Sequence, residues 1–485
     1  MTDLAIWIVA AVLVCWLALV RRPESYLWLL FAVAPWPGLY VAMIWNLDAF
    51  KLGLLLAPLV LLLRLPHHET RLFRVLAALL GYALILAAWQ VITHEVVEFD
   101  VLKHLDIQVR LAAANYLFLC RLLLVFLVCS VARTQTALRS CIHAYVGSAA
   151  VLGLYGLIQE GSFLAQGNPI TFMHDKGILG DANRIATADI FGVTFLRIYS
   201  FCMEPKDLAL FMAPAIAFVS TTLSVGARDF GRRSFQWVLL TVLCAAALLT
   251  FSTSLLIVAP LMLLGIELAG PRSNSSRAVR RFAVIAALLL IASPVLEEMW
   301  KVRVDQRLSS GETTILQKSR EAPALEFLVD HLPRSLVGYG VGTQAFYLPS
   351  YMPAEFREMA NSSDVVVGMD SFWFSLLLDL GIPGVLLVGM ACLQCLGRGS
   401  KRHDSSWPYR AAFLATVVMS IPQQGDLRSG ILWLFMGLAY QARSMVRAQT
   451  IQAHPLLIRG DRTLAVCGAP TEARAWQDIA APPRR

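Results

Sequence analysis

Charged side chains are scarce in this sequence. The 485 residues contain 41 Lys and Arg and 33 Asp and Glu, so charged residues make up 15% of the chain, against about 25% in soluble domains. Hydrophobic residues make up 57%. Apolar runs close to the length of a bilayer-spanning helix recur along the whole chain. These proportions exclude a soluble enzyme of two or three domains and predict an all-α, polytopic integral membrane protein.

Several other signals are missing. The nine cysteines lie mostly inside apolar runs, and the close pair Cys392 and Cys395 has no second pair or histidine beside it. Structural zinc needs four ligands, so we expect no metal. Basic residues do not alternate with aromatic ones on a soluble face, which argues against nucleic acid. The first apolar run, Leu4–Val20, lacks a basic stretch before it and a cleavage site after it, so we expect a retained helix.

The apolar runs predict thirteen transmembrane helices, and twelve or fourteen remain open because the first three runs are the weakest. Alternate loops between these spans are rich in arginine, whereas the short loops of the other set contain little. The positive-inside rule then predicts an outer N-terminus and a cytoplasmic C-terminus. The predicted spans are approximately 4–20, 26–45, 52–65, 75–93, 111–132, 141–158, 207–226, 235–251, 254–270, 282–298, 371–396, 411–424 and 430–446.

Two long segments interrupt the spans, and both fall on the predicted outer side. Loops this long are usually functional, and the longer one is expected as a single large periplasmic loop between the tenth and eleventh spans. The predicted organisation is a transmembrane bundle (1–158), an outer loop (159–206), further spans (207–298), the large outer loop (299–369), C-terminal spans (370–447) and a disordered cytoplasmic tail (448–485).

Candidate catalytic and binding residues gather in these outer segments. Arginine suits a diphosphate because its guanidinium group forms bidentate hydrogen bonds with phosphate oxygens. A carboxylate at the membrane edge suits a general base, because burial near apolar surface raises its pKa. The candidates are Arg197, Glu204, Lys206, Arg307, Lys318, Arg320, Gly338, Gly340, Asp370 and Ser371.

Each candidate also has a purely structural interpretation. Basic side chains beside a span commonly reach towards lipid head groups, and Asp370 with Ser371 would suit a helix N-cap. The glycines of "GYGVG" lack the strand and the Lys-Ser/Thr of a nucleotide loop, although their N–H groups could wrap a lipid diphosphate.

Two charged residues lie inside predicted spans. Arg121 occupies the middle of "YLFLCRLLLVFLV", and Asp379 lies nine residues after Asp370. A charge at mid-membrane costs at least about 2.5–3.5 kcal/mol, so such residues usually face a partner or a wet cavity. We therefore expect a polar cavity open to the outside, with a contact between Arg121 and Asp379 as one form of it.

At these residues the chain resembles the bacterial O-antigen ligase and polymerase family. The resemblance covers about Arg197 to Gln441. The matching positions are Arg197, Ser200, Phe201, Glu204–Pro205 and Leu208–Ala209, then Arg320, Pro333 and "GYGVG", then "DSFWFSLLLDLGIPG" from Asp370. Family ligases typically carry His-Asn where this chain has Asp370–Ser371, and an acidic residue there looks more like the Wzy-type polymerases.

The resemblance implies glycosyl transfer on the outer face of the bacterial inner membrane, with a glycan on polyprenyl diphosphate as donor and a second glycan as acceptor. It implies no metal and no other cofactor. Asp370 would be the base, with Arg197 and Arg320 stabilising the diphosphate. Membrane lipids, a chain-length regulator and a flippase are the implied partners. A ligase that transfers glycan to lipid A-core or protein, and a transporter of lipid-linked glycan, remain open.

Overall fold

The computed structural model of the chain describes residues 23–36, 40–42, 47–48, 71–93, 95, 107–170, 187–190, 192–200, 202, 205–227, 229–252, 255, 259, 262, 266, 293–294, 297, 321–351, 369, 371–397, 405–422 and 430–459. The predicted spans 4–20 and 52–65, and most of 254–270 and 282–298, lie outside these residues. The prediction that the chain is disordered from residue 448 is wrong at its start, because helix α18 (Gly430–Arg459) continues through residues 448–459; the chain after Arg459 lies outside the described residues. The chain divides into Met1–Arg443 and Ser444–Arg485. The second unit contributes only the last turns of helix α18 to the description.

The described part is mostly helical, as expected for an all-α membrane protein. Five helices are long and apolar enough to cross a membrane. They are α4 (Arg71–Thr93), α5 (Ile107–Val131), α6 (Gln135–Gln166), α8 (Pro205–Val225) and α16 (Phe372–Leu396). Helices α2 (Pro23–Val33), α9 (Arg233–Leu249), α17 (Trp407–Met419) and α18 (Gly430–Arg459) accompany them.

Local sequence signals explain where several helices begin and end. The Thr134 hydroxyl accepts a hydrogen bond from the Ala137 amide at the start of α6, and Gly167 closes that helix in the left-handed conformation, as capping rules predict. Pro205 opens α8, where a missing N–H costs nothing. Because α6 continues to Gln166, the outer loop predicted from residue 159 begins later than expected.

The prediction of one span over 26–45 is wrong. Helix α2 ends at Val33, and strand β1 (Tyr40–Ala42) pairs with β2 (Leu47–Asp48) instead. The reason lies in the sequence that follows Val33, which contains Pro35 and Pro37. Proline has no N–H to donate and disfavours helical geometry in the residue before it.

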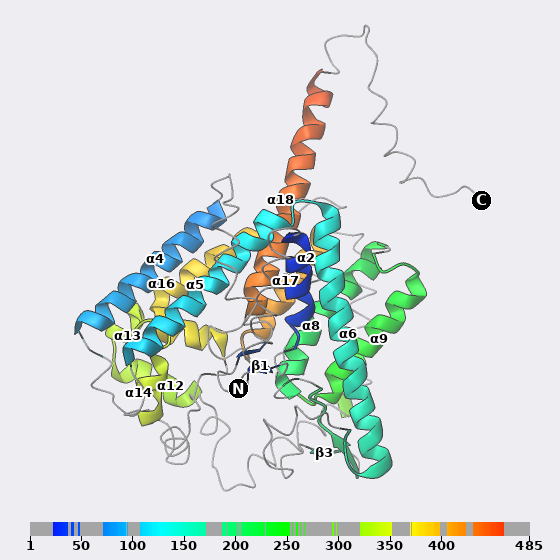
Figure 1. The fold of residues 1–485 in the computed structure, drawn as a ribbon, viewed down its shortest axis with the longest axis horizontal. Coiled ribbons are helices and arrows are strands. Elements are labelled where there is room, and N and C mark those ends of the chain that lie inside the picture. Colours follow the sequence, from blue (N-terminus) through cyan, green and yellow to red (C-terminus); the bar gives the residue numbers. More distant parts are fainter. Residues whose placement is uncertain are drawn as a thin grey trace, which may run out of the picture. The chain divides into compact units, whose positions relative to one another are not determined.

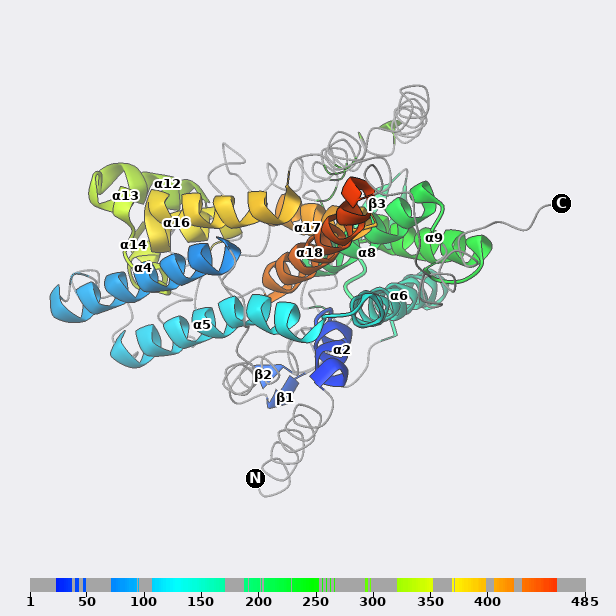
Figure 2. The same cartoon turned by 90° about the horizontal axis from the view of Figure 1, so that it is seen from above.

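The helices pack in two neighbouring sets within residues 1–443. Helix α4 packs against α5 and α16, and Figures 1 and 2 show the three helices running alongside one another. Helix α8 packs against α6, α9 and α17, and α2 packs against α6. Three short helices, α12 (Glu321–Asp330), α13 (Arg334–Val337) and α14 (Gln344–Tyr351), contact α16.

Contacts between loops agree with the predicted alternation of the spans. Arg139 forms an ion pair of 3.4 Å with Asp229, and both belong to loops predicted on the arginine-rich side. At the other end, Nε of Arg334 lies 2.9 Å from Oε1 of Glu95, and Nε of Arg197 donates to the Thr250 carbonyl at 3.4 Å. Figure 1 shows α12–α14 and strand β3 (Thr187–Ile190) at the same lower end of the helices. These contacts join segments that the sequence predicts on the same side of the membrane, and the orientation itself stays a prediction.

Candidate functional site

The glycine run after α13 lies between three of the long helices. A Cβ on Gly338 would be 2.5 Å from the backbone nitrogen of Gly381 in α16, and one on Gly342 would be 2.5 Å from Cβ of Ala114 in α5. A Cβ on Gly340 would face the backbone of Leu86 in α4 at 3.7 Å. Each glycine thus permits close approach to a different helix, which is a structural reason for the Gly-x-Gly-x-Gly pattern.

Helix α16 is interrupted where the glycine run crosses it. Gly381 has φ 62° and ψ −165°, which is not helical, so the carbonyls before it can bond outside the helix. The amide of Tyr339 donates to the Leu378 carbonyl at 3.2 Å, and that of Gly340 to the Asp379 carbonyl at 2.7 Å. The break and the glycine run therefore complete each other's hydrogen bonds.

Asp379 is fully buried at this crossing. Its Oδ2 accepts a hydrogen bond of 3.2 Å from the amide of Gly342. Burial, and after it the negative charge of Asp379, raise the pKa of Tyr347 in α14 well above its ordinary value. The phenol therefore stays protonated beside the carboxylate, where it can serve as a donor.

Polar side chains follow one face of the N-terminal half of α16. Ser371, Ser375 and Asp379 recur every fourth residue and are all buried, as the helical repeat requires for one face. Ser375 accepts a hydrogen bond of 2.7 Å from Nε2 of Gln344, which is also buried. We call Ser371, Ser375, Asp379 and Gln344 the polar seam. It descends from the predicted outer end of α16 to the helix break.

An ion pair holds the segment before the glycine run to the end of α4. Arg334 donates from Nε and one terminal nitrogen to the Glu95 carboxylate at 2.9–3.0 Å, and Gln90 donates to the same carboxylate at 3.3 Å. The Arg334 guanidinium also lies 4.9 Å from the centre of the Tyr339 ring and donates to the Gly338 carbonyl. Arg334 thus links the glycine run to Glu95, in addition to neutralising the charge of that carboxylate.

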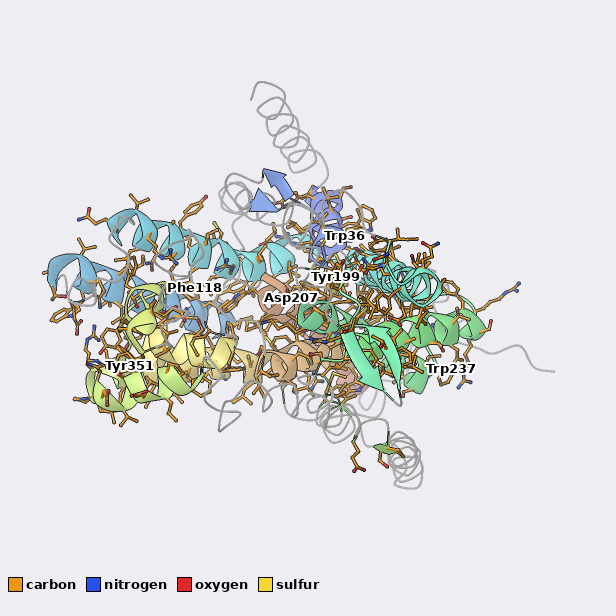
Figure 3. All side chains as sticks on the ribbon, turned by 90° about the horizontal axis from the view of Figure 1, so that it is seen from below. Trp36, Phe118, Tyr199, Asp207, Trp237 and Tyr351 are labelled. Carbon is orange, nitrogen blue, oxygen red and sulfur yellow. The ribbon has the colours of Figure 1, made fainter. Side chains whose placement is uncertain are left out.

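Arg197 stands on a short ordered segment along α6. The preceding strand β4 (Val193–Leu196) pairs with β3. The Ser200 amide donates to Oε1 of Gln159 at 2.9 Å, and its hydroxyl to the Leu152 carbonyl at 2.8 Å. Ile198 packs where Gly156 leaves room for it, since a Cβ there would be 2.8 Å from the isoleucine Cδ1. Figure 3 shows Tyr199 and Asp207 near this segment, and Tyr351 on the α14 side.

A buried carboxylate accompanies this segment. Glu160 of α6 is 5% exposed, and neither of its oxygens has a hydrogen-bond partner within the described part of the chain. The backbone amide of Leu196 is the polar group beside this carboxylate. Burial of an unsatisfied carboxylate is costly, so Glu160 belongs among the candidate residues although the sequence analysis did not select it.

The structure describes seven of the twelve predicted site residues. Gly338, Gly340, Ser371 and Asp379 come together at α16. Arg197 directly follows β4, Lys206 lies in the first turn of α8, and Arg121 is buried in α5. Five predictions lie outside the described residues, namely Glu204, Arg307, Lys318, Arg320 and Asp370.

Hydrogen bonds already engage Ser371 and the two glycines that were predicted to bind substrate. Ser371 is the N-cap of α16, and its hydroxyl accepts from the Phe374 amide at 3.4 Å. The amides of Gly338 and Gly340 are already donated to the carbonyls of Arg334 and Asp379, so a diphosphate at these glycines would have to displace those bonds.

Arg121 and Asp379 are both buried inside the protein, at 2% and 0% exposure. Neither side chain therefore faces lipid, and this burial is compatible with the polar interior expected from the sequence. A direct contact between the two remains a prediction.

Ser375, Gln344, Glu95 and Glu160 were not predicted from the sequence. The four-residue spacing of Ser371, Ser375 and Asp379 was readable in the sequence. Gln344 is 31 residues from its partner, and only the folded chain brings it there. Within the described ranges, no group of three or more His, Cys, Asp or Glu could hold a metal ion.

The geometry can support hydrogen bonding to a polar substrate, through the seam and the Arg197 segment. Comparison with protein-family models finds no match to this chain, and comparison with curated proteins finds none either. The family resemblance seen in the sequence therefore stays a prediction.

Proposed function

We propose that the chain is an inner-membrane glycosyltransferase that polymerises polyprenyl-diphosphate-linked oligosaccharide repeat units on the outer face of the membrane. The product would be O-antigen, capsule or exopolysaccharide. The observation that carries the proposal is the buried polar seam of α16, which runs from the end of the helix next to Asp370 down to Asp379. Polar and ionisable residues inside a membrane-spanning helix are energetically costly and usually mark a functional site.

A second feature supports a diphosphate-linked donor. The Arg197 segment lies at the same end of the helices as α12–α14, and its backbone is fixed by Gln159 and Leu152. A fixed arginine at the membrane edge can stabilise the charge that develops on a departing diphosphate. The flexible tail of the lipid would remain in the bilayer.

In the proposed reaction, a hydroxyl oxygen of the acceptor sugar attacks the anomeric carbon of the donor. The bond between that carbon and the diphosphate oxygen breaks, and polyprenyl diphosphate leaves with both bonding electrons. Asp370 receives the hydroxyl proton, while Arg197 and Arg320 hold the diphosphate. Lys206, Glu204, Arg307 and Lys318 would assist in binding.

The break in α16 favours one alternative, a transporter of the same lipid-linked glycan. Discontinuous helices with polar groups at mid-membrane are common in transporters. Here, however, the break is filled by the glycine run rather than left open towards both faces. We therefore rank transport below glycosyl transfer.

The test compares a strain lacking the protein with strains carrying Asp370→Asn or Arg197→Ala, by the size distribution of lipid-linked and surface glycan. Asp364→Asn is the control for Asp370→Asn, because it removes a carboxylate from the same predicted outer loop. Arg232→Ala is the control for Arg197→Ala, because it removes a guanidinium group from the opposite end of the helices. Collapse to single repeat units with both site variants, and normal length with both controls, is the expected result.

The other outcomes assign the alternatives. Long lipid-linked chains that never reach an acceptor would establish a ligase. Repeat units trapped on the cytoplasmic face would establish a transporter. Full activity of Asp370→Asn would remove Asp370 from the reaction.

A further inference from the structure

We infer that residues 334–343 form a re-entrant segment that enters the membrane from the outer side and presents Leu336 and Val337 to the acyl chains of the outer leaflet. The segment belongs to the loop that the sequence placed wholly outside. This inference is independent of the proposed reaction and requires only that α4, α5 and α16 cross the bilayer.

Depth along the neighbouring helices is the first argument. The Tyr82 hydroxyl donates to the Val337 carbonyl at 2.5 Å, and Tyr82 lies about 16 Å from the Thr93 end of α4 at roughly 1.5 Å per residue. Gly342 meets Ala114, about 10 Å inside α5 on the same scale. Gly338 meets Gly381, about 13 Å inside α16. The depths measured along the three helices are consistent, and each places the segment well inside the helix bundle.

The backbone hydrogen bonds of the segment are the second argument. Irregular backbone at membrane depth is tolerated only where its polar groups are satisfied within protein or a wet cavity. The amides of Gly338, Tyr339 and Gly340 donate to backbone carbonyls, and that of Gly342 donates to Asp379. The carbonyls of Val337 and Gly338 accept from Tyr82 and Arg334. This degree of internal satisfaction fits a segment surrounded by hydrocarbon.

The third argument comes from the exposed side chains, which indicate that lipid acyl chains cover this surface. Leu336 and Val337 are 41% and 45% exposed. They adjoin α4, whose own outer face exposes Ile85 at 67% and Trp89 at 52%. An apolar surface continuous with a lipid-facing helix is covered by the same lipid. Arg334 instead extends towards Glu95 beyond the end of α4, as a basic side chain near the membrane edge does.

The test uses the unmodified full-length chain reconstituted with photoactivatable phospholipid. One lipid carries a diazirine in the acyl chain and a second carries it in the head group, and labelled residues are mapped by mass spectrometry. The acyl probe should label Leu336 and Val337 about as heavily as Ile85, and several-fold more than the head-group probe does. Glu326, which is exposed on α12, should not be labelled by the acyl probe.

Labelling of Leu336 and Val337 by the head-group probe alone, or by neither probe, would overturn the inference. Failure of the acyl probe at Ile85 would also overturn it, because α4 would then not face lipid. None of these outcomes bears on polymer length, so the proposed function is tested separately.

Discussion

Replacement of Gly381 by alanine should destabilise the protein strongly. Its φ of 62° with ψ −165° belongs to a region used almost only by glycine, and holding another residue there costs about 1–3 kcal/mol. The added Cβ would lie 2.3 Å from the Leu336 oxygen and 2.4 Å from the Val337 carbonyl carbon. Both are backbone atoms that cannot rotate away, and overpacking of this kind costs about 1–3 kcal/mol more.

The sum, about 2–6 kcal/mol, is a large part of a typical stability of about 5–15 kcal/mol. The assay is the apparent midpoint of thermal unfolding in detergent micelles. Gly389→Ala is the matched control, because it lies in the same helix and a Cβ there meets no atom within 4 Å. It should stabilise slightly, since alanine is the better helix former by about 1 kcal/mol. Equal unfolding midpoints for Gly381→Ala and wild type would refute the close packing of residues 336–338 against the break in α16.

Three further experiments test the site. Ser375→Ala should lower the free energy of unfolding by about 1–3 kcal/mol in a chemical denaturation assay, because the buried Gln344 amide loses its acceptor. The double variant Ser375→Ala/Gln344→Met should recover part of that loss in the same assay. Glu95→Gln should cost about 1 kcal/mol or less, since both partners are about a quarter exposed and water screens the pair, whereas Arg334→Ala should cost more by also uncovering Tyr339. Arg197→Ala should reduce polymer formation in membrane vesicles by about 100-fold or more, and equal activity of the two proteins would remove Arg197 from the diphosphate site.

The sequence predicted the helices better than it predicted the site. Apolar runs located α4, α5, α8, α9 and α16 to within a few residues, because a bilayer span requires one long uninterrupted hydrophobic stretch. The error at 26–45 came from counting apolar residues across Pro35 and Pro37, whose backbone effect outweighs their hydropathy.

The site was harder to predict because its contacts are distant in the chain. Asp379 was selected from the sequence for its charge. Its position at a helix break became visible only in the folded chain, where Gly338, more than forty residues earlier in the sequence, packs against α16. The glycine run was selected for its free amides, yet those of Gly338 and Gly340 bond within the protein. Composition indicates which groups are present, but tertiary packing determines which of them remain available.

The crossing of the glycine run and α16 also constrains how the protein is made. The Gly342 amide has its acceptor 37 residues later in the chain, so roughly 2–7 s of synthesis separate donor and acceptor at about 5–20 residues per second. During that interval the amides of Tyr339, Gly340 and Gly342 lack their acceptors in α16, and hydrocarbon offers them no other acceptor. The segment must therefore wait at the aqueous surface until α16 has been inserted. Entry of residues 334–343 into the membrane is consequently a late step of biogenesis, governed by the helix that follows it.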